Sequence, residues 1–226
     1  MMMNKLLKGL CASVVFCASM GAMAEGVSLI GSKVAIGQGG AQTWYVGTLA
    51  GFQSNGNNLG DFEAANLGSY TLGSTGYLSG AQVQTFTVQA PSSATVTGAS
   101  LFWRVGSTGA FNEVGLGFTT NAPFTDVAGD LFDQPGQQQW AGWGSDIDFL
   151  AGVGVGSHTL EVYFGAAATL VGGGSLNLVE DNSGNYFRAN FTVTGGGQGG
   201  SVPEPSALAL AGLSLALLAA SRRRGA

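Results

Sequence analysis

The stretch TLEVYF at residues 159–164 decides the fold class, because polar and apolar side chains alternate along it. Successive side chains of an extended strand point to opposite faces. Leu160, Val162 and Phe164 are therefore predicted to point to a buried face. The intervening residues, which include Glu161, are predicted to point to solvent. The segment predicts a half-buried β-strand.

Similar segments recur along the chain between clusters of Gly, Asn and Ser, with no long helical period. The last one, residues 186–193, is predicted to bury Phe187 and Phe191 and to expose Arg188. The others span residues 27–36, 43–49, 67–72, 83–88, 99–105, 113–118, 147–150 and 176–179. About ten strands without helices predict an all-β fold, an antiparallel two-sheet sandwich with a jelly-roll-like topology.

The N-terminus has the composition of a secretory signal peptide. Lys5 and Lys8 precede an apolar core at residues 10–18, and the small-residue site Ala22-Met23-Ala24 follows. Cleavage by signal peptidase after residue 24 removes both cysteines, Cys11 and Cys17. The exported chain is then predicted to contain neither a disulfide nor a thiol nucleophile.

The C-terminus combines a flexible linker with a tripartite tail. The Gly-rich linker spans residues 195–201, and the predicted tail spans residues 202–226. Prolines at 203 and 205 favour an extended, accessible peptide around Val202-Pro203-Glu204-Pro205. An apolar run at 207–220 follows as a predicted membrane helix, and Arg222, Arg223 and Arg224 form a cytoplasmic stop.

This order of elements resembles the PEP-CTERM sorting tail of Gram-negative surface and exopolysaccharide-associated proteins. The resemblance implies transient insertion in the inner membrane, processing by an exosortase near the Pro-Glu-Pro sequence, and a final location at the cell surface, outer envelope or biofilm matrix. One departure is the length of the apolar run. Its 14 residues rise about 21 Å as a helix, short of the ~30 Å hydrocarbon core. Arginine snorkelling and local thinning compensate for this shortfall.

The domain between these signals, residues 25–194, is strongly acidic. It has twelve acidic and three basic residues, a net charge of −9. Such a surface repels phosphate backbones and anionic lipids, which excludes nucleic acid as a partner. Neutral glycans and cations are compatible with it.

Four short stretches of the domain also resemble β-sandwich modules of secreted bacterial surface proteins, most of them uncharacterised. They are residues 43–45, 98–105, 160–164 and 182–187. The resemblance implies the fold and an extracellular setting, and no catalytic residue is carried over from it.

Catalytic motifs are scarce in the domain. His158 is the only histidine, it lies in a turn sequence, and no Gly-x-Ser-x-Gly elbow brackets a serine. We therefore predict a non-enzymatic domain. Five aspartates, Asp126, Asp130, Asp133, Asp146 and Asp148, suggest three interpretations: solvated turn residues, a Ca²⁺ site built on hard oxygen ligands, or an acid pair for glycoside hydrolysis. The spacing of the aspartates does not match that of an EF-hand loop.

Two tryptophans in a polar, Gly-rich stretch suggest a glycan contact. Trp140 and Trp143 lie beside Gln138 and Gln139, and indole faces stack on sugar rings while amides bind hydroxyls. The alternative is that both indoles fill the end of the sandwich. Trp103 shares the apolar phase of its strand and is predicted in the core.

The sequence thus predicts an exported envelope protein with a structural or adhesive β-sandwich that associates with exopolysaccharide. The alternatives are a carbohydrate-binding or glycoside-cleaving secreted protein and a calcium-dependent adhesive module. No cofactor is predicted other than Ca²⁺ under the last alternative.

Overall fold

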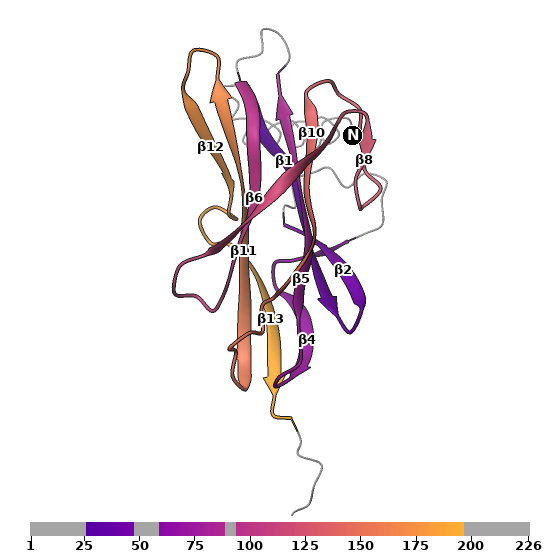
Figure 1. The fold of residues 1–226 in the computed structure, drawn as a ribbon, viewed down its shortest axis with the longest axis vertical. Coiled ribbons are helices and arrows are strands. Elements are labelled where there is room, and N and C mark those ends of the chain that lie inside the picture. Colours follow the sequence, from indigo (N-terminus) through magenta and orange to yellow (C-terminus); the bar gives the residue numbers. More distant parts are fainter. Residues whose placement is uncertain (1–25, 48–58, 89–93, 197–226) are drawn as a thin grey trace, which may run out of the picture. The chain divides into compact units, whose positions relative to one another are not determined.

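The computed structural model describes residues 26–47, 59–88 and 94–196, and over these residues it contains strands and no helix (Figure 1). The all-β prediction is confirmed. The predicted signal peptide, most of the linker and the whole tail, including its predicted helix, lie outside these residues. Within the described ranges, no helix is long and apolar enough to cross a membrane.

The strands are numbered along the chain. They are β1 Val27–Gln38, β2 Ala41–Val46, β3 Gly60–Asp61, β4 Ala65–Thr71, β5 Tyr77–Thr87, β6 Ala94–Val105, β7 Asn112–Asn121, β8 Phe124–Thr125, β9 Leu131–Phe132, β10 Gln137–Asp148, β11 Gly156–Leu170, β12 Ser175–Glu180 and β13 Phe187–Thr194.

Eleven of the strands form one sheet instead of the two separate sheets that the sequence predicted. The order is β3-β2-β1-β5-β10-β7-β6-β11-β13-β4, with β12 beside β11, and β8 and β9 pair separately. The sheet folds over on itself, since β5 contacts β6 and β1 contacts β11. We call the β1–β5–β10 side half A and the β6–β11–β13 side half B. Most pairs are antiparallel, but β2–β3 and β4–β13 are parallel.

Strand β7 joins the two halves because it changes partners along its length. Residues 112–116 pair with β6, and residues 117–121 pair with β10. The strand therefore runs diagonally from one half to the other (Figure 1). A single β-strand that pairs in both halves leaves no boundary at which two sheets separate.

A second connection runs through residues 60–71, where β3 lies beside β2 in half A and β4 lies beside β13 in half B. Phe62 between them is fully buried and meets the Tyr45 ring edge-on at 5.9 Å. The Ala64 amide donates to the Arg188 carbonyl at 2.6 Å, and the Arg188 amide donates to Glu63 Oε2 at 2.9 Å. The halves are thus held together on both sides of the core.

The core lies between the halves and contains the predicted inward rows. Leu160, Val162 and Phe164 are each 0 % exposed, and Phe187 and Phe191 are also buried. Trp103 packs against this core, as predicted. The prediction that Glu161 faces solvent is wrong, because its residue is 1 % exposed. The strand alternates as expected, but its outer face is covered at this position by two arginines.

Candidate functional site

The predicted acidic residues do not gather into one site. Asp126 is buried, and its Oδ2 pairs with Lys33 Nζ at 2.5 Å while its Oδ1 accepts the Ala128 and Asp130 amides. Asp148 Oδ1 instead accepts the amides of Gly76 and Leu150 at the end of β10.

The other acidic candidates add no shared ligand set. Asp133 is exposed, Asp130 is buried, and the side chain of Asp146 lies outside the described part of the structure. Among the described residues, no group of three or more His, Cys, Asp or Glu side chains is placed to hold a metal ion. The calcium site stays a prediction.

The Lys33–Asp126 pair belongs to a buried polar layer on the outer face of half A. Residues 122–136, which carry β8 and β9, cover that face, and Gln82 Oε1 accepts the Val127 amide at 3.4 Å. Gln84 and Gln139 are also buried in the layer. Because Lys33, Gln82 and Gln84 alternate with inward apolar residues, they point together to the covered face.

The predicted glycan residues lie on different faces of β10. Trp140 points inward, is 7 % exposed and meets Phe118 edge-on at 5.4 Å. Gln139 points to the covered outer face, whereas Gln138 Nε2 donates to Asn121 Oδ1 at 3.1 Å. Trp143 pairs through its backbone with Gly80, and its side chain is outside the described part. Trp140 therefore does not share an exposed platform with Gln139.

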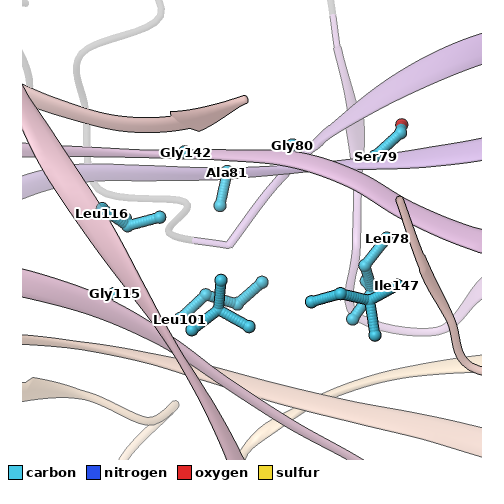
Figure 2. A pocket seen from close by; sticks show the side chains of 10 residues that line it. Leu78, Ser79, Gly80, Ala81, Leu101, Gly115, Leu116, Gly142 and Ile147 are labelled. Atoms are coloured by element: carbon cyan, nitrogen blue, oxygen red, sulfur yellow. The ribbon is translucent and has the colours of Figure 1, made fainter. Parts of the chain in front are cut away.

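An apolar crevice of about 110 Å³ lies where β7 leaves β10 for β6. Figure 2 shows Leu78 and Ile147 on one side of it and Leu101 and Leu116 on the other. A Cβ at Gly142 would lie 2.8 Å from Leu116 Cδ2, so a side chain there would make the Leu116 side chain shift. The lining is almost entirely apolar, so the crevice offers little with which to orient a polar ligand.

The outer face of half B holds a charged cluster. Glu161 Oε2 pairs with Arg104 through Nη2 at 2.6 Å, and Glu161 Oε1 pairs with Arg188 Nε at 2.8 Å. The pairing follows from register, because Glu161 lies opposite Arg104 on β6 and opposite Arg188 on β13. The two guanidinium groups explain how a carboxylate is buried on this face.

Aromatic rings extend this cluster along the same face. Phe102 and Tyr163 stack in parallel at 4.4 Å, and Phe111 meets Tyr163 edge-on at 4.8 Å. The Arg104 guanidinium lies 4.2 Å over the Phe111 ring and 5.3 Å over the Tyr186 ring. The pKa of Tyr163 is raised, first by burial and then by Tyr186 and by the carboxylates of Glu113 and Asp181. Two carboxylates, those of Glu113 and Asp181, therefore act on this ring.

Beside the stacked pair lies a groove of about 560 Å³ across β7, β6, β11 and β12. Its floor is made of small residues, and its wall contains Phe102 and Tyr163. Ser100 Oγ donates to Glu113 Oε1 at 2.7 Å. The floor consists of Gly98, Ser100, Gly115, Gly165 and Ala167, and Asn177 lies at the β12 side. Aromatic, hydroxyl, amide and carboxylate groups thus meet in one open groove.

This groove was not predicted from the sequence. The alternation of β11 did put Tyr163 outside, and an inward Trp103 implies an outward Phe102. What was missing was the pairing of β6 with β11, which brings the two rings together.

His158 has a structural environment. Its Nε2 lies 2.8 Å from the Gly154 carbonyl oxygen, and its ring stacks on Phe191 at 5.3 Å. These contacts hold the loop that precedes β11.

The comparison with family models concerns the tail. A model described as the PEP-CTERM protein-sorting motif matches residues 201–224. The tail is a PEP-CTERM sorting motif. The PEP-CTERM motif marks an exported protein that is directed to the cell surface or envelope and processed by an exosortase. The predicted resemblance of the tail is confirmed. The search of curated proteins found no match to the chain.

Proposed function

We propose that residues 25–194 form a non-enzymatic structural or adhesive module, which the PEP-CTERM tail delivers to the envelope and which associates there with extracellular polysaccharide. The observation that carries the proposal is the motif match at residues 201–224. Export determines which partners the domain meets, and outside the inner membrane these are surface polymers and other envelope components.

The contacts of the carboxylates support a non-enzymatic role. Asp126 and Glu161 are engaged in buried ion pairs, and Asp148 accepts two backbone amides. Glycoside hydrolysis needs two carboxyl groups facing each other about 5 to 9.5 Å apart across the sugar. The groove on half B has one carboxylate in its lining, Glu113.

The charge of the domain supports the class of partner. A net charge of −9 over residues 25–194 disfavours an acidic polymer at low ionic strength. A polysaccharide without acidic groups avoids this repulsion and offers hydroxyl groups to a polar surface.

Fractionation of cells that make the full chain, or a chain that ends at residue 201, tests the proposal. The full chain is expected in the surface polysaccharide fraction, with an intact mass that lacks Arg222, Arg223 and Arg224. The shortened chain is expected to leave that fraction. Recovery of the arginines in surface material, or equal fractionation of both chains, would contradict the proposal.

A separate assay covers the enzymatic alternative. The purified protein is expected to release no reducing sugar from the polysaccharide of the producing cells. Release that an Asp→Asn substitution abolishes would replace the proposal with a glycoside-cleaving function.

A further inference from the structure

We propose that the groove on the outer face of half B is a binding site for a polysaccharide segment that carries no acidic groups, an inference that deepens the proposed function and rests on it. The site is defined by the floor residues of β6, β7 and β11, the stacked rings of Phe102 and Tyr163, and the polar groups of Ser100, Glu113 and Asn177.

The chemistry of the groove fits a sugar ring. A pyranose has apolar C–H faces and a rim of hydroxyl groups. Phe102 and Tyr163 provide apolar ring surface in the wall. The Glu113 carboxylate accepts hydrogen bonds, the Ser100 hydroxyl, whose proton is donated to Glu113, accepts them, and the Asn177 amide both donates and accepts. A few placed polar groups beside aromatic surface are typical of a site that orients a small polar ring.

The electrostatics select against acidic sugars. Glu113 lines the groove, and both Glu113 and Asp181 act on the neighbouring Tyr163 ring. The nearest arginine of the cluster, Arg104, is held by Glu161 and by the Gly109 carbonyl. A uronic acid would meet negative charge here, whereas a neutral or amino sugar would not.

Two glycines of the groove floor also support the presence of an occupant. Gly98 and Gly115 have no positive φ angle, and a Cβ at either position would meet nothing within 4 Å. At Gly115 neither backbone conformation nor internal packing requires glycine, although glycine weakens a strand interior. Gly98 lies beside a β-bulge of β6, where glycine is common. The missing side chains leave room for an occupant to approach the sheet closely. Gly165 differs, because a Cβ there would come 3.1 Å from the Phe102 ring, which leans over it.

These two glycines allow a test that leaves the fold intact. Gly98→Leu and Gly115→Leu add apolar volume to the groove lining at positions where a Cβ meets nothing within 4 Å. Gly154→Leu is the matched control, since that glycine also has open space around it and lies outside the groove. All three variants are expected to keep the thermal midpoint of the full chain.

Binding is measured by calorimetry with cellohexaose, mannohexaose and chitosan hexamer, with polygalacturonate, and with the polysaccharide of the producing cells. The full chain is expected to bind at least one non-acidic glycan and to bind polygalacturonate at least tenfold more weakly. Gly98→Leu, Gly115→Leu and Phe102→Ala are each expected to weaken binding at least tenfold, and Gly154→Leu to leave it unchanged.

The outcomes separate the two proposals. If the producer's polysaccharide binds and the filled variants bind equally well, the groove is overturned and the proposed function stands. If no glycan binds, both the groove and the association with polysaccharide are overturned. Preference for polygalacturonate would also overturn the groove, because the charge argument would be wrong.

Discussion

Breaking the buried Lys33–Asp126 pair is expected to destabilise the domain strongly, and more when the aspartate is replaced than when the lysine is replaced. The side chains are 5 % and 0 % exposed, so neither charge reaches water when its partner is removed. Removing one member of such a pair costs about 3–5 kcal/mol. Lys33→Met leaves Asp126 with its two backbone amide donors, which favours the lower value. Asp126→Asn leaves the Lys33 ammonium buried without an ion-pair partner among the described residues, which favours the upper value.

The two-residue variant Lys33→Met/Asp126→Asn decides whether the pair itself is responsible. It removes both charges and keeps an oxygen to accept the turn amides, so its cost is expected to fall below that of either single change. For a domain of this size, 3–5 kcal/mol lowers the melting temperature by roughly 6–20 °C. Thermal and urea unfolding of the four proteins measure the cycle. A single change that costs less than about 1 kcal/mol, or a double change equal to the sum of the singles, would refute the reasoning.

Three further predictions concern the charged cluster on half B, the buried Tyr70 and the predicted calcium site. Glu161→Gln is expected to cost about 3 kcal/mol in urea unfolding, because the Arg104 side chain is only 14 % exposed and loses its ion-pair partner. Arg188→Gln is expected to cost less than about 1 kcal/mol, because the Arg188 side chain is 46 % exposed. Equal costs for the two variants would contradict this expectation. Burial and then Tyr45 raise the pKa of Tyr70 to about 12, above the ordinary value of 10.0, so its contribution to stability is complete below pH 10 and is lost as the pH rises through 12. Tyr70→Phe should reduce that alkaline loss and cost nothing at pH 7, since the hydroxyl is buried without a partner; an unchanged alkaline transition would oppose this. Addition of EDTA or Ca²⁺ should leave the melting temperature unchanged, and a calcium-dependent rise would support the predicted calcium site instead.

Local alternation predicted strands well where one face is buried. Residues 159–164 and 186–193 show this, because the inward residues of both are in the core. It failed for the stretch from Gln137 to Trp143, which forms most of β10 with few apolar residues. That strand is covered on one face by residues 122–136, so its outward glutamines are buried and the usual polar–apolar contrast is absent.

The long-range pairing of the strands could not be predicted from the sequence. The change of partner in β7 falls between Leu116, which lies opposite β6, and Gly117, which lies opposite β10, and neither residue carries a local signal of this. The same limit applies to Glu161. Its exposure was predicted from its phase in β11, but its burial depends on Arg104 and Arg188, which are distant in sequence and become neighbours through register. The groove was missed for this reason as well.

The folding of one sheet into two halves determines which surface is available to a partner. On half A, residues 122–136 cover the polar layer, and Trp44 lies over the backbone of Gly80, within 3.3 Å of where a Cβ would be. On half B, Glu161 is covered by Arg104, Arg188 and the aromatic rings, and this cover ends at Phe102. Beyond Phe102 the strands carry small residues and stay open. The open floor beside the aromatic wall is therefore the surface proposed to bind a polymer, and the Gly98→Leu and Gly115→Leu variants test that proposal.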